Sequence, residues 1–440
     1  MNYDVTIIGA GLAGSEAALS LAARGLRVHL IDMKPDARTP AHQASTLSEL
    51  VCTNSLKAKR INSASGLLKE ELNRLGSFLL RIAHEHEVPA GGALAVDRDR
   101  FSEAVTQAID ANPLIDFTTQ VVHEIPDERP LVLATGPLTE GGLYESLRKL
   151  TGSEHLRFFD AAAPIVRGDS IDPERSFRQS RYGRGGDDYI NCPMNKEEYE
   201  TFVDVLLEAE LAEQSDFDRK LLFEGCMPVE SMAERGRDTL RFGPMKPVGL
   251  TDPRTGRRPW ANLQLRQETA DGDMWNLVGF QTRLKFPEQR RVFRLIPALA
   301  QAEFERYGVM HRNSFIDSPR VLTPQLELRS APGVFVLGQL TGLEGYVPAI
   351  MSGVLAADSI EAYLRGTVAE ILPAETMSGA LVRHITDASI KDFQPMTASF
   401  GLLPALSERI KDKQARGQAY ADRALQAFEA HMTNTPLITH

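Results

Sequence analysis

The sequence predicts an α/β protein in which a doubly wound parallel sheet forms one domain and an α+β domain is inserted into that domain. Three observations support this: a strand, glycine-rich turn and helix at the N-terminus, two further buried strands at 129–137 and 332–339, and a more charged, turn-rich stretch between them. The 440 residues suffice for about two to four domains. We expect the main domain over 1–165 and, with C-terminal helices, 326–440, and the inserted domain over 166–325.

The composition is that of an ordinary globular protein. Lys and Arg number 49 and Asp and Glu 59, which gives a net charge of −10, and 42% of the residues are hydrophobic. These values exclude wholesale disorder and collagen-like structure. The N-terminus lacks a basic segment followed by an apolar one, and no uninterrupted apolar run reaches 18 residues. We therefore expect a cytoplasmic protein that is not attached to a membrane.

Cysteine and histidine usage argues against structural metals and disulfides. Cys52, Cys192 and Cys226 are few and irregularly spaced, which is typical neither of a disulfide framework nor of a zinc ribbon, and fits a reducing compartment. His84 and His86 lie two positions apart, so a helix would turn their rings away from each other. The sequence predicts no metal site.

The first 32 residues predict one βαβ unit. Residues 3–9 form a β-branched run that ends in glycine, and residues 12–24 carry Leu and Ala with helical recurrence. A second apolar strand over 26–31 follows Gly25 and ends at Asp32. The turn between the first strand and the helix is the glycine motif Gly9-Ala10-Gly11-Leu12-Ala13-Gly14.

This motif, in this context, predicts a Rossmann-like dinucleotide site. Gly9 permits the tight turn, Gly11 lets a pyrophosphate approach the backbone, and Gly14 allows close helix packing. The helix N-terminus contributes unpaired N–H groups and the positive end of its dipole. Asp32, 18 positions beyond Gly14, is placed to accept a hydrogen bond from a ribose hydroxyl.

Two later strand ends favour FAD over NAD as the dinucleotide. Ala134-Thr135-Gly136 ends one buried strand, and a G-x-x-x-G run begins at Gly338, at the end of another. In a doubly wound sheet the ligand lies outside the carboxyl ends of the strands. We therefore expect Gly136, Gly338 and Gln339 to face the crevice that Gly11 faces.

The rest of the chain predicts one long loop and several helices. Residues 35–62 are polar and read as a loop, and long loops in compact domains are usually functional. Helical patterns cover 64–87, 101–111 and 348–365, and the stretch 406–431 is an amphipathic, solvated helix.

Two of the cysteines are candidates for chemistry. Cys52 lies in the long loop, and Lys57, Lys59 and Arg60 would stabilise its thiolate if their side chains turn toward it. Cys226 follows a glycine in the inserted domain. The ordinary role of a single cysteine is that of a small buried hydrophobe, and we keep that interpretation for Cys192.

The sequence resembles the folate- and FAD-dependent tRNA (uracil-5-)-methyltransferases, the TrmFO family, which are relatives of the GidA flavoproteins. The shared strings span nearly the whole chain and are more specific than the glycine motif. They are Gly9 to Gly14, Pro40-Ala41-His42, Glu49 to Cys52, Asn54-Ser55-Leu56, Gly66 to Glu71, Pro89 to Arg98, Arg181-Tyr182-Gly183, Asn191 to Met194, Phe242 to Leu250, Val278 to Thr282, Met310 to Asn313 and Phe393 to Met396.

The resemblance implies a one-carbon transfer to RNA. In this family FAD takes a methylene carbon from 5,10-methylenetetrahydrofolate and passes it to C5 of the T-loop uridine of tRNA, and NADH or NADPH supplies the reducing electrons, which gives 5-methyluridine. Uracil C5 is a weak nucleophile, so a thiolate must first add at C6. One activated cysteine is therefore required.

The resemblance also implies roles for three residues. Cys226 is expected to attack the base and Cys52 to lie against the flavin, although the two roles could be exchanged. Tyr346 follows the late flavin strand and is either the base that removes the C5 proton or an aromatic that packs on the cofactor. The chain departs from the family after Val347, where Pro348 to Met351 replace the usual Glu-Ser-Ala-Ala and remove a carboxylate.

The expected partners are tRNA and folate, with no obligate protein partner. Net negative charge is unusual for an RNA-binding enzyme, since Lys and Arg contacts to phosphates dominate affinity. Two basic clusters could nevertheless form a local RNA-binding face; their members are Arg254, Arg257 and Arg258, and Arg283, Lys285, Arg290, Arg291 and Arg294. The alternatives are a GidA-like enzyme that modifies wobble uridines, an FAD/NAD(P)H oxidoreductase acting on a small molecule, and a non-catalytic flavin-binding scaffold.

Overall fold

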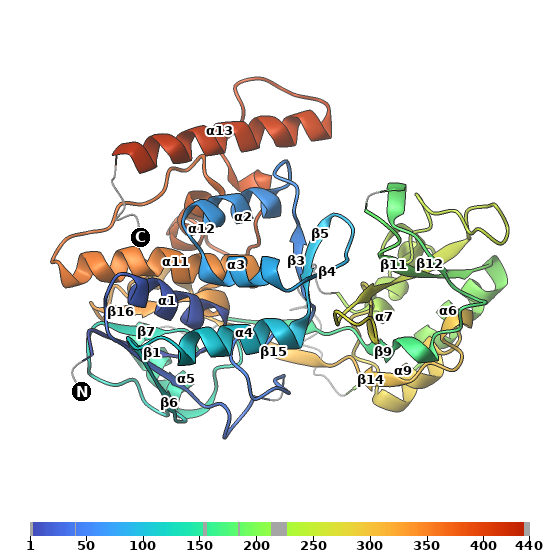
Figure 1. Cartoon of the computed structure of the whole chain (residues 1–440), viewed down its shortest axis with the longest axis horizontal. Coiled ribbons are helices and arrows are strands. Elements are labelled where there is room, and N and C mark those ends of the chain that lie inside the picture. Colours follow the sequence, from blue (N-terminus) through green and yellow to red (C-terminus); the bar gives the residue numbers. More distant parts are fainter. Residues whose placement is uncertain (1–2, 40, 153–155, 184, 213–226, 435–440) are drawn as a thin grey trace.

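A computed structural model of the chain describes residues 3–39, 41–152, 156–183, 185–212 and 227–434. Two bodies lie side by side in Figure 1. We call the body that carries the parallel sheet the main domain and the body that carries the larger antiparallel sheet the inserted domain. The prediction of an α/β protein with a parallel sheet is confirmed.

The main domain is built on a five-stranded parallel sheet. Its strand order is β16-β7-β1-β2-β6. Ile7 at the centre pairs with Leu30 on one side and Val132 on the other, and all three are fully buried. The strands are β1 (Val5–Ile8), β2 (Val28–Asp32), β6 (Ile115–Thr119), β7 (Leu131–Leu133) and β16 (Val334–Val336). Both later strands thus join the sheet, as the sequence predicts.

Two apolar helices pack together on this sheet. They are α1 (Leu12–Ala23) and α11 (Tyr346–Leu364). Among the described helices, α11 is long and apolar enough to cross a membrane, but two-thirds of it is buried inside the protein, where it serves as a core helix. The buried carboxylate of Glu16 on α1 accepts hydrogen bonds from the Phe78 and Leu79 N–H groups and so satisfies the start of a neighbouring helix.

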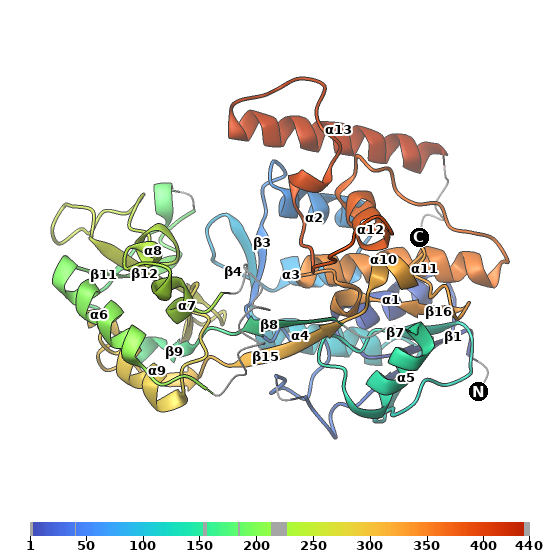
Figure 2. The ribbon, with the colours of Figure 1, turned by 180° about the vertical axis from the view of Figure 1, so that it is seen from behind.

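Further helices surround this centre. They are α2 (Ala64–Arg74), α3 (Phe78–Glu85), α4 (Arg98–Asp110), α5 (Gly141–Thr151), α10 (Ser318–Val321), α12 (Met377–Thr386) and α13 (Lys413–Asn434). Figures 1 and 2 show α13 lying across α2 at the outside of the main domain. The helical pattern over 64–87 corresponds to two helices, because Gly76, at φ +76°, ends α2 and the Ser77 side chain caps α3.

A small antiparallel sheet faces the inserted domain. Its order is β3-β5-β4, with β3 (Ser55–Ala58), β4 (Glu87–Val88) and β5 (Ala93–Val96). The stretch 35–62 is therefore not loop throughout, because its end forms β3. The sequence does not reveal β3, since this short strand depends on pairing with β5, about 40 residues away.

The inserted domain is built on a six-stranded sheet of order β10-β11-β12-β13-β9-β14 whose neighbours are all antiparallel. Trp275, Phe280 and Phe293 lie at the centre of its core. Its strands are β9 (Ile165–Arg167), β10 (Phe177–Arg178), β11 (Tyr189–Met194), β12 (Ala261–Gln267), β13 (Met274–Leu277) and β14 (Phe304–Arg306). Its helices are α6 (Lys196–Glu208), α7 (Val229–Glu234), α8 (Thr239–Phe242) and α9 (Phe286–Phe293).

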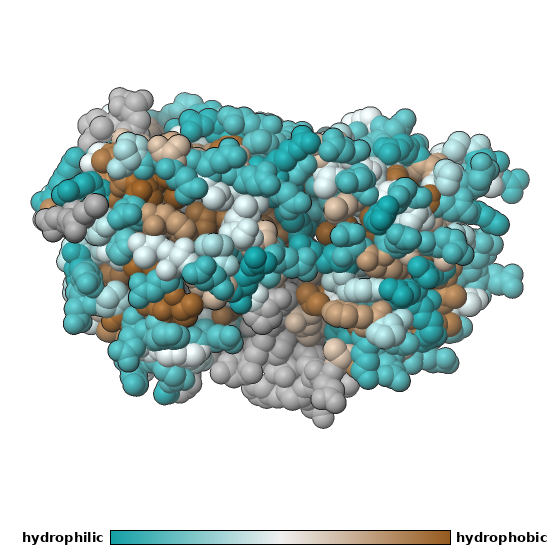
Figure 3. Space-filling view, turned by 60° about the horizontal axis from the view of Figure 1, so that its bottom comes forward, coloured by the Kyte–Doolittle hydropathy of each residue, from teal (hydrophilic) through white to brown (hydrophobic). Residues whose placement is uncertain are grey.

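A two-stranded ribbon joins the domains. It consists of β8 (Leu156–Ala161) paired antiparallel with β15 (Met310–Phe315), so the chain leaves and re-enters the main domain along the same path. On this basis we propose boundaries near 161 and 310 in place of the expected 165 and 325, because Ile316, Val321 and Leu322 already pack in the core of the main domain. In the space-filling view of Figure 3, hydrophilic residues cover the outer end of the inserted domain, whereas hydrophobic residues show in separate areas over the main domain.

Candidate functional site

The glycine motif lies at the carboxyl edge of the parallel sheet. Gly9 and Gly14 are closely packed against backbone atoms, whereas Gly11 faces open space. A Cβ added to Gly9, which has φ +102°, would lie 2.4 Å from the Ala134 carbonyl oxygen, and one added to Gly14 would lie 1.8 Å from the Gly9 carbonyl oxygen. A Cβ on Gly11 would meet no atom within 4 Å. The turn therefore excludes side chains where strand and helix meet and leaves space where a pyrophosphate would approach.

Polar groups beside this turn fit a dinucleotide. One oxygen of the Asp32 carboxylate accepts a hydrogen bond from the Ala10 N–H (2.6 Å) and the other from the Lys34 N–H (2.9 Å). The Ser48 N–H donates to the Ala10 carbonyl (3.0 Å), and the buried Ser48 hydroxyl has no hydrogen-bond partner among the described residues. A buried hydroxyl without a partner beside an open turn suits a polar ligand. Ser48 carries no motif that would have identified it from the sequence.

The structure brings the other predicted cofactor residues to the same edge. The neighbouring strands β1, β7 and β16 end there, because all three run parallel. Gly136 follows β7, and a Cβ added to it would meet no atom within 4 Å. Gly338 follows β16 and approaches Ala13 of the glycine motif. The Gln339 amide donates to the Glu344 carboxylate (2.6 Å).

A buried ion pair organises the long loop next to this edge. Lys34 Nζ lies 3.1 Å from Glu49 Oε2, and the Gln43 N–H also donates to this carboxylate. Burial raises the pKa of Glu49, but the Gln43 hydrogen bond and the Lys34 charge outweigh it and hold the pKa below its ordinary value. The loop that carries Cys52 is therefore anchored three residues before the thiol.

The second part of the site is the contact between Cys52 and Tyr346. Tyr346 is the first residue of α11, and its hydroxyl oxygen lies 3.1 Å from Cys52 Sγ. The same oxygen accepts hydrogen bonds from the Cys52 N–H (3.0 Å) and the Thr53 N–H (3.2 Å). The structure thus joins two predicted site residues that are 294 positions apart in the chain.

These contacts determine which way the Tyr346 proton points. A phenol oxygen has two acceptor positions, and the two N–H groups occupy both. The hydroxyl proton is then directed to Cys52 Sγ, so Tyr346 donates to the sulfur. Burial of the hydroxyl and the adjacent Cys52 raise the pKa of Tyr346 well above its ordinary value, and the phenol stays protonated at neutral pH. Such a group holds a proton and is a poor base.

Arg98 supplies the buried positive charge of this site. Its Nη1 donates to the Leu50 carbonyl (2.6 Å), and its Nη2 lies 2.9 Å from Glu268 Oε2 of the inserted domain. Burial lowers the pKa of Arg98, but the Glu268 carboxylate outweighs this effect and the pKa stays above its ordinary value. Tyr346 and Cys52 contribute to the same rise of the pKa, and Arg98 Nη1 lies 3.4 Å from the carbonyl oxygen of Val51, the residue before Cys52.

The basic residues that follow Cys52 in the sequence point elsewhere. Lys57 Nζ donates to Thr397 Oγ1 (2.8 Å), Lys59 forms an ion pair with Glu87, and Arg60 is exposed. Lys57 and Lys59 are therefore paired with groups other than the thiol. Arg98 replaces them because it reaches the loop from α4, almost 50 residues away, which proximity in the sequence does not indicate.

The inserted domain also forms hydrogen bonds with this loop. The Asn54 amide donates to the Val96 and Gln267 carbonyls (both 2.9 Å), and Arg266 Nε donates to Asn54 Oδ1 (2.8 Å). These side chains are buried, and they join β5 of the main domain to β12 of the inserted domain. The Cys52 loop therefore lies at the junction between the two domains.

Of the other two cysteines, Cys192 lies among the described residues and Cys226 does not. Cys192 is fully buried in β11, and burial raises the pKa of its thiol, which fits a packing role. Cys226, the other candidate thiol, lies outside the described residues. Among the described residues, no three His, Cys, Asp or Glu side chains form a group that could hold a metal ion.

The two basic clusters of the inserted domain have different surroundings. Arg283 is buried near Glu230, so its assignment to an RNA-binding face is wrong. Lys285 and Arg291 form ion pairs with Glu210 and Glu288. The first cluster, in contrast, lines an open pocket; its members are Arg254, Arg257 and Arg258.

Comparison with known proteins identifies the family of this chain. A family model described as glucose inhibited division protein A, GidA, matches residues 4–367. Methylenetetrahydrofolate–tRNA-(uracil-5-)-methyltransferases TrmFO of Acetivibrio thermocellus and Geobacter sulfurreducens are 52% and 55% identical to this chain, each over 98% of it and over 98% and 99% of their own lengths. The chain belongs to the TrmFO family.

The solved structures agree with this fold. An Aquifex aeolicus GidA structure superposes with a TM-score of 0.70 at 15% identity and covers 98% of this chain and 73% of its own. The matches to TrmFO relatives extend over both domains, so the Cys52 loop, the glycine motif and the inserted domain all lie within one family alignment. The resemblance inferred from the sequence strings is confirmed.

Proposed function

We propose that this TrmFO-family protein transfers a methylene carbon from 5,10-methylenetetrahydrofolate, by way of FAD, to C5 of the T-loop uridine of tRNA and reduces it to a methyl group. The observation that carries the proposal is the contact between Cys52 and Tyr346, with the buried Arg98 bonded to the same loop, which the Ser48 N–H ties to Ala10 of the glycine turn. Relatives that are more than half identical over their full length bear the name of this activity.

The residues of the main domain fit FAD. The space in front of Gly11 takes a pyrophosphate, the α1 N-terminus offers N–H groups to it, and Asp32 stands at the end of β2 for a ribose hydroxyl. The Ser48 hydroxyl would find its partner on the same ligand. When bound, FAD supplies the carrier for the one-carbon unit and the route for electrons.

The chain's own thiols prepare the uracil. C5 becomes nucleophilic once a thiolate has added to C6, and after the carbon transfer the C5 proton must leave so that the thiol can be eliminated. We assign the attack to Cys226 and the place beside the flavin to Cys52, with the exchanged assignment as the alternative. Tyr346 as the base remains a prediction, and its contacts favour a different role.

We infer that Tyr346 is a hydrogen-bond donor that stabilises the Cys52 thiolate. Its two N–H donors come from the backbone of the Cys52 loop itself, so the hydroxyl orientation and the loop conformation are coupled. Arg98 adds a fixed positive charge in the same buried space. Together they would keep Cys52 reactive without a nearby lysine.

The remaining expectations complete this proposal. NADH or NADPH is the reductant, folate and tRNA are the partners, and the protein works in the cytoplasm without an obligate protein partner. The alternatives are a GidA-like modification of wobble uridines and an oxidoreductase that acts on a small molecule. The names of the near relatives favour the T-loop reaction over the wobble reaction.

The test follows a labelled carbon. Unmodified tRNA transcript is incubated with labelled methylenetetrahydrofolate, NADPH and the FAD-loaded protein, and the label in 5-methyluridine is counted. We expect transfer by the wild type, loss of at least about 100-fold in Cys226→Ala and in Cys52→Ala, and near-normal transfer in Cys192→Ala, the matched control with a buried thiol. A wild type that contains NADPH-reducible FAD but labels no tRNA would favour the small-molecule oxidoreductase.

A further inference from the structure

A second pocket lies at the outer end of the inserted domain, away from Cys52. It has a volume of about 730 Å³ and is lined by residues from β11, α6, α8 and the loop before β12. Six of its lining side chains are Lys or Arg and two are carboxylates, an excess of four positive charges in a protein whose net charge is −10. Its cations are Arg175, Lys196, Arg241, Arg254, Arg257 and Arg258.

The pocket combines free cations with an exposed aromatic ring. Asp252 pairs with Arg254 and Glu198 caps α6, so the two carboxylates are occupied. In contrast, the side chains of Arg175, Arg257 and Arg258 make no hydrogen bond or ion pair with any described residue. These three charges are available to a ligand.

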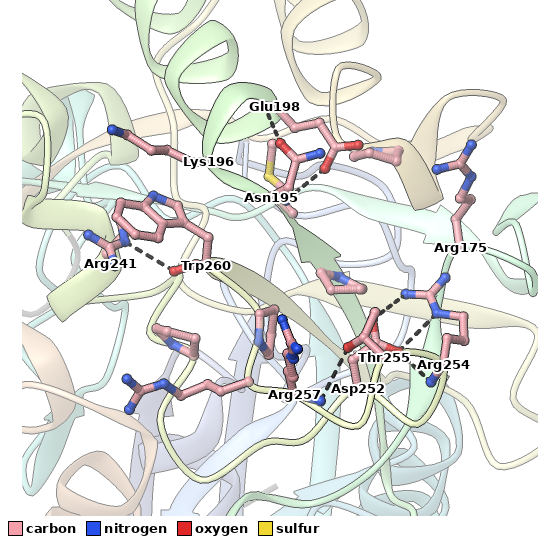
Figure 4. A pocket seen from close by; sticks show the side chains of 16 residues that line it. Arg175, Asn195, Lys196, Glu198, Arg241, Asp252, Arg254, Thr255, Arg257 and Trp260 are labelled. Atoms are coloured by element: carbon pink, nitrogen blue, oxygen red, sulfur yellow. Dashed lines mark hydrogen bonds and ion pairs between the residues drawn. The ribbon is translucent and has the colours of Figure 1, made fainter.

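Trp260 is the aromatic member of the pocket. The Arg241 guanidinium lies 3.8 Å from the centre of the indole ring, and 38% of the Trp260 surface remains exposed. Figure 4 shows Trp260 with Arg241 and Lys196 on one side of the pocket and Arg175 and Arg254 on the other. Lys196 Nζ also lies over the ring, 5.7 Å from its centre, so a planar group could stack there in place of this more distant cation while phosphates meet the arginines.

The length of strand β12 gives the distance between this pocket and the Cys52 loop. Trp260 directly precedes the strand, whereas Arg266 near its far end donates to Asn54 of the loop. Six residues of strand at about 3.3 Å each make this distance about 20 Å. A ligand in the pocket is thus remote from the Cys52 loop.

We propose that this pocket binds an unpaired nucleotide of the tRNA, other than the uridine that is modified, by stacking its base on Trp260 and its phosphates on Arg257 and Arg258. The inference rests on the proposed function, because it takes tRNA as the substrate. Aromatic stacking platforms combined with cationic tracks are how proteins hold single-stranded nucleic acid, and RNA loops expose such bases. A nicotinamide dinucleotide has similar groups and is the competing occupant that the test separates.

The test measures tRNA affinity as a function of salt. Unmodified tRNA transcript is titrated with the FAD-loaded full-length protein at several KCl concentrations. We expect Trp260→Ala to weaken binding about 5-fold or more with an unchanged salt slope, because it removes stacking. Arg257→Ala/Arg258→Ala should lower the slope of log Kd against log salt by about 1 to 2, because it removes phosphate contacts.

Two controls make the result specific. Arg167→Ala/Arg320→Ala removes two exposed, ion-paired arginines outside the pocket and should leave both affinity and slope as in the wild type. Trp260→Phe keeps an aromatic surface and should recover most of the affinity lost in Trp260→Ala. Circular dichroism and bound FAD establish that each variant is folded.

The outcomes separate this proposal from the proposed function. An unchanged salt slope in Arg257→Ala/Arg258→Ala, or a raised KM for NADPH with normal tRNA affinity, overturns the pocket assignment. Methyl transfer at saturating tRNA should be nearly normal in the pocket variants. A wild type that binds tRNA with the expected slope yet transfers no methyl group would instead overturn the methyltransferase function and leave the pocket assignment standing.

Discussion

The loop that carries Cys52 and the pocket that contains Trp260 lie at opposite ends of strand β12. Charged side chains are buried and paired at the loop, whereas the pocket has an excess of positive charge. At the loop, Arg98 and Glu268 are buried and paired with each other. At the pocket, positive charges outnumber negative ones by four, and the aromatic ring is partly exposed. One strand therefore connects a buried ion pair to an open pocket with an excess of positive charge.

This difference separates two tasks of an enzyme. Groups that act on reacting atoms gain from a dry, fixed environment, where electrostatic interactions are stronger and no reorganisation is needed. Groups that capture a large polyanion gain from exposed charge, which speeds association and releases counterions. The same residue type, arginine, serves both tasks, and burial decides which one.

The largest effect is expected from removal of the buried charge of Arg98. Arg98→Ala leaves Glu268 buried without its partner and deprives the Leu50 carbonyl of its donor, so we expect the free energy of unfolding to fall by about 3–5 kcal/mol. Urea denaturation measures this value. The exposed neighbour Arg100 is the control, because Arg100→Ala should cost at most about 1 kcal/mol. Equal costs for the two variants would contradict the role given to Arg98.

The next largest effect concerns the proton between Tyr346 and Cys52. Tyr346→Phe removes a hydrogen bond to the thiolate that should contribute about 1.5–3 kcal/mol, so the pH midpoint for alkylation of Cys52 should rise by about one to two units. The measurement uses iodoacetamide in a background of Cys192→Ala and Cys226→Ala, where Cys52 is the only thiol. Tyr363→Phe, on the same helix, is the control. If the midpoint does not move, Tyr346 is not the donor.

A further prediction concerns the buried carboxylate of Glu71, which lies away from both regions. Glu71 accepts hydrogen bonds from the Met377 and Ser378 N–H groups at the start of α12, and burial raises its pKa to about 7. Between pH 4.5 and 7 the folded state then binds more protons than the unfolded state, so this group's contribution to stability falls as the pH rises.

Glu71→Gln removes this titration. The variant should gain about 1–3 kcal/mol relative to the wild type between pH 5 and pH 8, as measured by denaturation at each pH. Glu70→Gln, at the partly exposed neighbouring position on the same helix, should show no such trend. A constant difference between Glu71→Gln and wild type across this range would refute the assignment.

The smallest effect is expected inside the pocket itself. The Asp252 carboxylate is paired with Arg254, and this hydrogen-bonded contact lowers the pKa of Asp252 below its ordinary value. Arg254→Ala should therefore change tRNA affinity by less than about 1 kcal/mol, clearly less than the loss of Arg257 and Arg258 together. Filter binding at fixed salt compares the variants. A larger loss from Arg254→Ala would show that the ion pair opens on binding.

Local sequence was sufficient for the dinucleotide turn. A strand, the glycines at 9, 11 and 14, a helix and then Asp32 occur within 32 residues, and the requirements of such a turn are local. The same holds for β7 and β16, whose short apolar runs predict buried strands. The helical pattern over 64–87 did not show the break at Gly76, because helical periodicity continues across it.

The fold class, the family and the candidate thiols could be predicted from the sequence, because these depend on patterns that neighbouring residues share. The tertiary structure decided which groups meet. It joined Cys52 to Tyr346 across 294 positions and brought Arg98 to the loop in place of Lys57 and Lys59. It also buried Arg283 while exposing Trp260. The physical reason is that the charge, the burial and the hydrogen-bond partner of a side chain are set by elements far away in the sequence.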